Sequence, residues 1–442
     1  MADSNATPER ASAFDTHHPP SNEIIEKCTH CGFCLPVCPT YVMWGQEMDS
    51  PRGRIYLMKL AAEGAVEMNS TSVSHFDSCL GCMACMPACP SGVDYGKLIE
   101  ATRAQIERNT ERTRSDKLHR RFLLETFTQP GRLRRMRWPL LAYQKTGLQA
   151  ILRGLGVVKL LPRKLQAMES LLPRLAAREA VAEITPAAGT KRRRVGLLLG
   201  CVQRAFFSQV NAATIRVLAA EGCEVVAPQA QSCCGALPAH AGDEATAVQL
   251  AKKTIDTFEH ANVDTVVTNA AGCGSSVKEY GHLLRDDPEY AERARQFAAK
   301  CKDISEVLAD LEPRAARHPL KLRVAFHDSC HLQHAQGVHS QPRALLSGIP
   351  ALELVEIPET PICCGSAGIY NLVQPDAATA LGDRKAQLIT TLNPGVVATG
   401  NPGCMLQLQS ALTRSGKQSP VLHTIQILDA SIRGLSVDAL LK

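Results

Sequence analysis

Residues 28–39 read CTHCGFCLPVCP, and residues 79–90 read CLGCMACMPACP. Both stretches have the spacing C-x2-C-x2-C-x3-C-P, with three cysteines at every third residue and a fourth followed by proline. Bacterial ferredoxins with two 4Fe–4S clusters use this spacing. Zinc sites instead use two C-x2-C pairs with a longer spacer or include histidine, and disulfides do not require such a pattern. The two stretches therefore predict two 4Fe–4S clusters.

The spacing also divides the eight cysteines into two ligand sets, because the fourth cysteine of each run reaches the other cluster. The first set is Cys28, Cys31, Cys34 and Cys89, and the second set is Cys79, Cys82, Cys85 and Cys38. We predict these eight as the cofactor-binding residues. Since such clusters carry electrons, the two sets predict an electron-transfer protein.

Length, charge and cysteine usage limit the class of protein. A chain of 442 residues is long enough for two or three domains, and a net charge of +6 is too mild to predict a nucleic-acid binder. The 18 cysteines stand in metal-ligand spacings, and residues 1–22 lack the apolar core of a signal peptide. No apolar run approaches the ~18 residues that span a bilayer. We therefore expect a cytoplasmic protein with reduced thiols.

Composition divides the chain into five segments. Residues 50–54, SPRGR, interrupt the pattern and residues 55–63 favour a helix, so the cysteine loops are expected between helices. The predicted segments are a disordered tail (1–22), an α-helical ferredoxin-like domain (23–110), a basic amphipathic helical linker (111–190) and two duplicated α/β repeats with small parallel sheets (191–318 and 319–442). The fold class is thus α plus α/β.

The linker mixes arginines with an apolar stripe between residues 128 and 190. Such a region could lie on an anionic membrane surface or against a partner. Packing on its own domain is the favoured interpretation, because amphipathic helices are the norm in globular proteins. The basic run KRRR at 191–194 precedes a strand-like run and is interpreted as a solvated domain edge.

The last half of the chain contains a duplicated cysteine pattern. Four cysteines recur at offsets of 129 to 131 residues, and the adjacent pair in each copy is followed by Gly235 or Gly365. The first copy is Cys201, Cys233, Cys234 and Cys273, and the second copy is Cys330, Cys363, Cys364 and Cys404. Strand-like runs alternate with helical patterns, which predicts parallel α/β units. Because sites in such units lie at the carboxyl ends of the strands, each copy should bring its four cysteines together.

These duplicated cysteines have three interpretations. Adjacent thiolates could bridge irons in an irregular cluster, share a zinc ion with neighbouring loops, or be buried structural thiols. We interpret them as candidate ligands of a third cluster or of zinc. Cys223 and Cys301 lack counterparts and are interpreted as structural. Ligation and a structural role both stay open for the histidines around Cys330, which are His327, His331 and His334.

These motifs together resemble a known family. The duplicated Cys-Cys-Gly unit is similar to the CCG domain of heterodisulfide reductase and of several hydroxy-acid dehydrogenase complexes. Combined with two ferredoxin signatures, it resembles the iron–sulfur subunit of bacterial glycolate oxidase (glycolate dehydrogenase) over about residues 23–435. The matching strings are CGFC (31–34), SPRGRIYL (50–57), GCG (272–274), VKEYG (277–281), LQHAQ (332–336) and CCGSAG (363–368).

The resemblance implies an oxidoreductase subunit. In that family a flavin-binding partner subunit oxidises glycolate to glyoxylate. The iron–sulfur subunit, with two 4Fe–4S clusters, passes the electrons to a quinone-type acceptor at the inner face of the inner membrane. FAD and the substrate site are therefore expected on a partner chain. The absence of a G-x-G-x-x-G turn and of a P-loop agrees with this, and we predict no catalytic residue in this chain.

Several alternatives stay open. The substrate could be D-lactate, glycerol 3-phosphate or another 2-hydroxy acid, the CCG half could itself reduce a disulfide or a quinone, or the chain could be a zinc-binding scaffold. The heterodisulfide-reductase unit ends in C-x2-C and offers five thiolates for a noncubane cluster. Here Ser276 and Gln407 occupy the last position, so each copy offers four thiolates.

Overall fold

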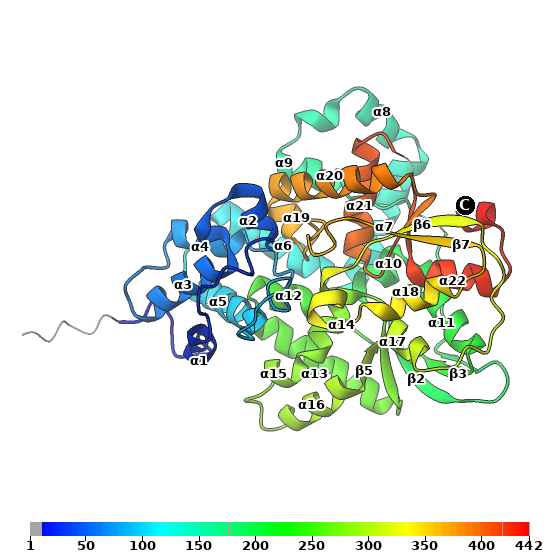
Figure 1. Cartoon of the computed structure of the whole chain (residues 1–442), viewed down its shortest axis with the longest axis horizontal. Coiled ribbons are helices and arrows are strands. Elements are labelled where there is room, and N and C mark those ends of the chain that lie inside the picture. The colour runs from blue at the N-terminus through cyan, green and yellow to red at the C-terminus, as the bar shows by residue number, and fades with distance from the viewer. Residues whose placement is uncertain (1–10, 176, 418, 442) are drawn as a thin grey trace, which may run out of the picture. The chain divides into compact units, whose positions relative to one another are not determined.

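The computed structural model describes residues 11–175, 177–417 and 419–441. The chain forms two compact units, which are considered separately (Figure 1). The N-terminal unit contains the chain up to Lys117 together with residues 240–244. The C-terminal unit contains residues 118–239 and 245–442.

Among the described residues of the N-terminal unit, all regular elements are helices, as predicted. Its elements are α1 (Asn22–Glu26), α2 (Pro39–Trp44), η1 (Glu47–Asp49), α3 (Pro51–Ala62), α4 (Ser70–Asp77) and α5 (Tyr95–Asn109). The first cysteine loop lies between α1 and α2, and the second lies between α4 and α5. Met58, Phe76 and Leu98 are fully buried in the core between these helices. The apolar faces of short helices thus hold the two cysteine loops.

Residues 11–21 run as an irregular segment that is attached to α5. Phe14 is buried, and the carboxylate of Asp15 accepts hydrogen bonds from Arg108 and Asn109. The hydrogen bond from Arg108 is the main cause that holds the pKa of Asp15 well below its usual range. Of the tail that the sequence predicts as disordered, residues 11–21 are therefore tied to the unit, and residues 1–10 lie outside the described residues.

The linker forms four α-helices and one short 3-10 helix. Their bounds are α6 (Arg114–Phe127), α7 (Pro130–Lys145), α8 (Leu148–Gly154), η2 (Val157–Leu160) and α9 (Arg163–Ser170). Leu133 is buried in the core of the C-terminal unit, whereas Trp138, Leu155 and Leu160 are exposed. The apolar stripe is thus only partly covered. Among the described residues, no helix is both long and apolar enough to cross a bilayer.

Two small sheets form the centre of the C-terminal unit. The first has the order β1-β3-β2-β4-β5, and the second has the order β7-β6-β8-β9. Their strands are β1 (Ile184–Thr185), β2 (Arg193–Leu198), β3 (Cys223–Val226), β4 (Thr265–Thr268), β5 (Cys301–Asp303), β6 (Leu322–Phe326), β7 (Leu352–Glu356), β8 (Val396–Thr399) and β9 (Val421–His423). All pairs are parallel except β1 with β3. Without β1 the two orders are the same, which confirms two duplicated units with parallel sheets.

Helices connect these parallel strands, as crossover connections require. In the first repeat they are α10 (Cys201–Phe206), α11 (Ser208–Ala220), α12 (Ala236–Ala241), α13 (Glu244–His260), α14 (Ala271–Lys278), α15 (Tyr280–Leu283), α16 (Ala291–Lys300) and α17 (Ile304–Ala309). In the second they are the π-helix η3 (His331–Ala335), α18 (Ser340–Ser347), α19 (Tyr370–Val373), α20 (Pro375–Leu392), α21 (Pro402–Arg414), α22 (Thr424–Ile432) and α23 (Val437–Leu441).

The last strand of each sheet leads into a helix through the same capping arrangement. Asp303 caps α17 and His423 caps α22, each in a capping box with the third residue of its helix. Burial raises the pKa of Asp303 to about 6 and lowers the pKa of His423 to about 4. The repeats therefore share backbone geometry while they differ in the chemistry of equivalent side chains.

Candidate metal centres

The two cysteine loops of the N-terminal unit make the same backbone turn. In each loop the residues directly before and after the second cysteine have positive φ: His30 (54°) and Gly32 (89°) around Cys31, and Gly81 (62°) and Met83 (61°) around Cys82. The left-handed conformation favours glycine, yet each loop has only one glycine, on opposite sides of the cysteine. In the second loop the turn lets the amide of Gly81 donate to Cys79 Sγ at 3.3 Å. The turn therefore brings a backbone amide of the loop close to a thiol of the same loop.

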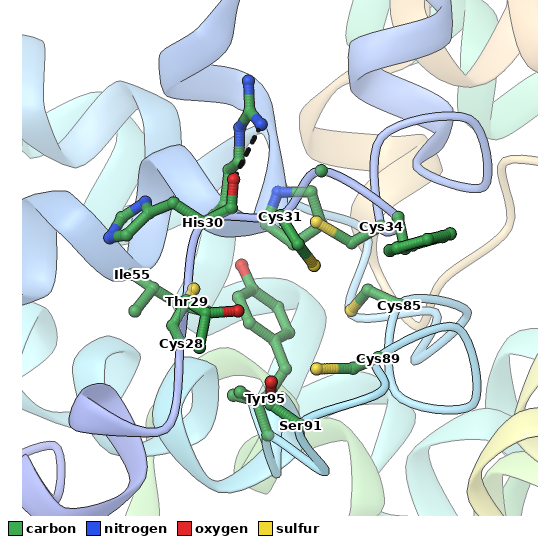
Figure 2. A pocket seen from close by; sticks show the side chains of 15 residues that line it. Cys28, Thr29, His30, Cys31, Cys34, Ile55, Cys85, Cys89, Ser91 and Tyr95 are labelled. Atoms are coloured by element: carbon green, nitrogen blue, oxygen red, sulfur yellow. Dashed lines mark hydrogen bonds between the residues drawn. The ribbon is translucent and has the colours of Figure 1, made fainter.

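The first predicted ligand set surrounds one pocket. Cys28, Cys31, Cys34 and Cys89 line it together with Cys85, and the pocket, measured to its open mouth, has a volume of about 410 Å³. Figure 2 shows these five cysteines arranged around the ring of Tyr95, which also lines the pocket. Cys31 is exposed. Burial raises the pKa values of Cys28 and Cys34.

The second predicted set is more deeply buried. Cys38, Cys79 and Cys82 are buried, and Cys38 Sγ lies 3.3 Å from the hydroxyl of Thr40. Burial raises the pKa of Cys85 well above its usual value, and the nearby thiolates of Cys82, Cys79 and Cys38 add to the shift. Cys85 thus lies within electrostatic reach of the other three thiols of its set, and also of Cys34 of the first set.

Residues 50–54, SPRGR, lie beside both cysteine loops. Ser50 caps α3 by accepting from the amide of Gly53, and Pro51 occupies the first turn of that helix. A Cβ on Gly53 would lie 2.0 Å from the carbonyl oxygen of Glu47, so only glycine allows α3 to approach η1 this closely. Arg52 points to the first loop, donating to the carbonyl of His30 at 3.0 Å and pairing with Glu47 at 2.6 Å.

Arg54 points the other way, into the protein beside the second loop. Its side chain is 1% exposed. The guanidinium donates to the carbonyl of His75 at 2.6 Å, to Ser78 Oγ at 2.7 Å, to Thr40 Oγ1 at 3.2 Å and to Asp49 Oδ1 at 3.3 Å. These groups flank Cys38 and Cys79 in the sequence. Arg54 therefore ties the ends of the two cysteine runs together and leaves a positive charge beside them.

Two further side chains act on the thiol of Cys79. Arg103 of α5 donates to the carbonyl of Cys79, and the hydroxyl of Tyr95 donates to Cys79 Sγ at 3.6 Å. Burial alone would raise the pKa of Cys79, but the charges of Arg54 and Arg103 and this hydrogen bond outweigh it, so the net shift is downward. Sequence reasoning missed Arg54, Arg103 and Tyr95, because only the fold brings them to the second loop.

The donor set fits two iron–sulfur clusters. It offers eight thiols on two neighbouring loops, a turn that exposes a backbone amide to sulfur, and cationic and hydroxyl donors beside Cys79. Clusters of this type are held by four thiolates each and are tuned by such hydrogen bonds and charges.

Each CCG repeat also brings its four cysteines together after the strand ends. In the first repeat Cys201 Sγ lies 3.6 Å from Cys233 Sγ, and Cys234 is hydrogen-bonded to both Cys233 and Cys273. In the second repeat the corresponding contacts join Cys330 to Cys363 at 4.0 Å, and Cys364 to Cys363 and Cys404. The duplicated pattern thus becomes two rows of contacting thiols.

The glycine after each cysteine pair allows this arrangement. Gly235 and Gly365 have φ values of 82° and 91°. The amide of Gly365 donates to Cys363 Sγ at 3.4 Å. A Cβ on Gly235 would lie 3.1 Å from the carbonyl of Ala247, and a Cβ on Gly365 would lie 2.7 Å from that of Ala378. Both turns therefore pack against the following helix at the same point.

The histidines distinguish the second repeat from the first. The ligand atoms of His327, Cys364 and Cys404 lie within 4.8 Å of one another, and all three residues are buried. A hydrogen bond from Cys364 and the neighbouring imidazole of His327 lower the pKa of Cys404 to about 5, against the effect of burial. His331 Nδ1 lies 3.4 Å from Cys330 Sγ, on the turn that starts the π-helix.

The unpaired cysteines of the sequence lie on strands. Cys223 begins β3 and Cys301 begins β5, and both are buried. Burial raises the pKa of Cys223 and raises the pKa of Cys301 to about 12. Such protonated thiols behave as small apolar side chains, in agreement with a structural role.

Family models match all three parts of the chain. A 4Fe-4S dicluster domain matches residues 24–93, and a cysteine-rich CCG domain matches residues 195–278 and 324–409. The segment 115–172, between them, matches the linker region of the glycolate oxidase iron-sulfur subunit. The boundaries agree with the order of cysteine loops, linker helices and repeats described above.

Similar proteins cover nearly the whole chain. A protein of Bacillus subtilis (strain 168) named "Probable glycolate oxidase iron-sulfur subunit" is 40% identical over 91% of this chain and 92% of its own length. The "Glycolate oxidase iron-sulfur subunit" of Escherichia coli (strain K12) is 36% identical over 93% of this chain and 95% of its own. "Lactate utilization protein A" of Geobacillus sp. (strain WCH70) is 31% identical over 54% of this chain and 99% of its own. The chain therefore belongs to the family of glycolate oxidase iron–sulfur subunits.

Proposed function

We propose that this chain is the electron-transfer subunit of a glycolate dehydrogenase (glycolate oxidase) complex. A flavin-binding partner subunit would oxidise glycolate to glyoxylate, and this chain would pass the electrons to a quinone-type acceptor. The observation that carries the proposal is the similarity to two glycolate oxidase iron–sulfur subunits over more than 90% of their length, combined with eight free thiols on two cysteine loops.

We assign the first cluster to Cys28, Cys31, Cys34 and Cys89 and the second cluster to Cys79, Cys82, Cys85 and Cys38. Bound 4Fe–4S clusters supply one-electron carriers, which divide the electron pair that a flavin collects. The chain's own residues separate the two groups by environment. Cys31 and the 65%-exposed Phe33 open the first group to solvent or to a partner, whereas Arg54 and Tyr95 enclose the second.

The CCG half supports an extension of the same path. We propose that one or both of its cysteine groups bind a third iron–sulfur cluster or zinc, because each group places four thiols in contact. We expect the complex to be cytoplasmic and peripheral at the inner face of the inner membrane, where a quinone is accessible. The incompletely covered linker helices are the surface that could meet a membrane or a partner.

A second substrate is supported by a specific observation. The similarity to lactate utilization protein A over half of the chain favours lactate as the alternative 2-hydroxy acid. Deletion of the gene distinguishes the two. Loss of growth on glycolate with unchanged growth on lactate supports the first proposal, and the reverse pattern overturns it.

Anaerobic purification of the complex tests the electron path directly. We expect a flavin-containing partner to co-purify and glycolate to reduce the iron–sulfur centres of this chain within the complex. About eight irons per chain correspond to the two assigned clusters, and about twelve correspond to one more cluster in the CCG half. Reduction of the flavin by glycolate without any reduction of the centres would contradict the proposed path.

A further inference from the structure

The two CCG repeats differ at one position beside their thiols. His327 stands three residues before Cys330, and Leu198 stands three residues before Cys201. Leu198 is the last residue of β2, and His327 directly follows the equivalent strand β6. Both side chains are nearly fully buried, with 2% exposure for Leu198 and 3% for His327. The second repeat therefore offers an imidazole where the first offers only hydrocarbon.

The imidazole lies among the thiols of its own repeat. Its ligand atom is within 4.8 Å of Cys364 Sγ and Cys404 Sγ, and those sulfurs are also within 4.8 Å of each other. Around one tetrahedral ion with metal–sulfur and metal–nitrogen distances of about 2.3 and 2.0 Å, ligand atoms lie roughly 3.5–3.8 Å apart. The three groups thus need to move only slightly to share an ion. Cys363, hydrogen-bonded to Cys364, is the candidate for the fourth ligand.

A second difference between the repeats points to the same place. Gly235 packs on Ala247 and Gly365 packs on Ala378, which aligns helices α13 and α20. At this alignment Lys385 of the second repeat replaces Thr254 of the first. Lys385 is 2% exposed, and its side-chain nitrogen donates to the carbonyl of Glu359 at 2.8 Å. Burial lowers the pKa of Lys385, and the nearby thiols of Cys364 and Cys363 oppose that shift. A buried cation is stabilised by a negatively charged neighbour, such as a metal with three thiolates and one imidazole.

We propose that the second CCG repeat holds a metal centre in which His327 supplies a nitrogen ligand beside Cys363, Cys364 and Cys404. The first repeat, with Leu198 in place of the imidazole, does not form this centre. The ligand set of sulfur and imidazole nitrogen fits a thiophilic transition metal, either a single zinc ion or iron in a cluster. The inference rests on the proposal for the CCG cysteines and extends it by naming the repeat and a histidine ligand.

Metal binding to the full-length protein tests this inference. The protein is purified anaerobically, its metal and sulfide are counted, and the chelator-treated CCG sites are then titrated with Co²⁺, whose thiolate charge-transfer bands report sulfur ligation. His327→Leu gives the second repeat the residue that the first repeat has at this position, and His327→Cys replaces one possible metal ligand with another. Cys404→Ser and Cys273→Ser remove equivalent cysteines from the two repeats.

We expect His327→Leu and Cys404→Ser to weaken Co²⁺ binding at least tenfold, and Cys273→Ser and His327→Cys to retain it. If the wild-type protein contains zinc and no sulfide beyond that of the two N-terminal clusters, the centre is a single ion. If it contains additional iron together with additional sulfide, the centre is a cluster. Both results support the centre. The proposal is overturned if wild type holds no metal beyond the two N-terminal clusters, if His327→Leu binds as tightly as wild type, or if Cys273→Ser loses as much as Cys404→Ser.

Two controls separate this test from other failures. Circular dichroism checks that each variant is folded. If His327→Leu does not fold, the test rests on His327→Cys, because loss of metal from that folded variant contradicts the inference. Electron paramagnetic resonance of the N-terminal clusters should be unchanged in every variant. Failure of glycolate to reduce the complex while the CCG metal is present would refute the proposed function and leave the metal site standing.

Discussion

The two cysteine loops of the N-terminal unit share their spacing and their backbone turn, but they lie in different surroundings. The first loop exposes Cys31, and its neighbouring arginine, Arg52, forms an ion pair with Glu47 near the surface. The second loop buries Cys79, and its neighbouring arginine, Arg54, is enclosed. Two arginines only two residues apart on α3 therefore serve opposite environments. The spacing of the cysteines determines the shape of such a loop. The packing of the surrounding helices determines which charges lie near its thiols and how far solvent reaches them.

The largest expected difference between the loops is in stability. Arg54→Met removes the guanidinium from the buried carboxylate of Asp49, which among the described residues keeps only His75 and Ser78 as partners, so we expect a loss of about 3–5 kcal/mol in the free energy of unfolding. Arg52→Met removes a partly exposed pair and should cost less than about 1 kcal/mol. Thermal and denaturant unfolding of the cluster-loaded variants measures both. Equal losses would show that the two arginines have equivalent roles.

The next difference concerns the reduction potentials of the proposed clusters. Arg103→Gln removes a charge beside Cys79, so the potential of the second cluster should fall, on the order of 50–100 mV. Arg52→Gln is the matched change beside the first loop, where solvent screens the charge, and its shift should be several times smaller. Redox titration followed by electron paramagnetic resonance reads both potentials. A larger shift for Arg52→Gln would reverse the proposed contrast.

Removal of metal should follow the same contrast. Cys31 and Phe33 line the first pocket and are both exposed to solvent. A chelator with a mild oxidant should therefore extract the first cluster about tenfold faster than the second. The signal that shifts in Arg103→Gln identifies the second cluster and should disappear last. Phe33→Ala should accelerate only the fast phase. Loss of both clusters at one rate would show that burial does not protect the second.

The smallest expected effects come from the backbone turn. His30 and Gly81 occupy the same place before the second cysteine of their loops, both with positive φ. His30→Gly should stabilise the protein by about 0.5–1 kcal/mol, less whatever its contact with the Tyr56 ring contributes. Gly81→Ala should destabilise it by about 1–2 kcal/mol, because a Cβ is disfavoured at that φ. Unfolding midpoints compare the pair, and a loss of stability in His30→Gly would mean that the turn is not strained there.

Much of the fold follows from patterns that are local in the sequence. The chain break at residues 50–54 and the helical pattern after it predict cysteine loops between helices, and the repeated Cys-Cys-Gly pattern predicts two parallel α/β units. The structure has both features. The additional antiparallel strand β1 at residues 184–185 lies in the segment predicted as linker, since a two-residue strand leaves almost no sequence signal. Residues 11–21 read as a polar tail because their partners, Gln105, Arg108 and Asn109, lie far along the chain.

The sequence by itself determined which cysteines are candidate metal ligands, because ligand chemistry and loop spacing are local properties of consecutive residues. Only the tertiary structure decided how those ligands differ. It buried Arg54 against Ser78 and Asp49, it closed α3 on η1 at Gly53, and it brought His327 to Cys364 and Cys404. The physical reason is that burial and electrostatic contact depend on packing between segments distant in sequence, which no local pattern contains.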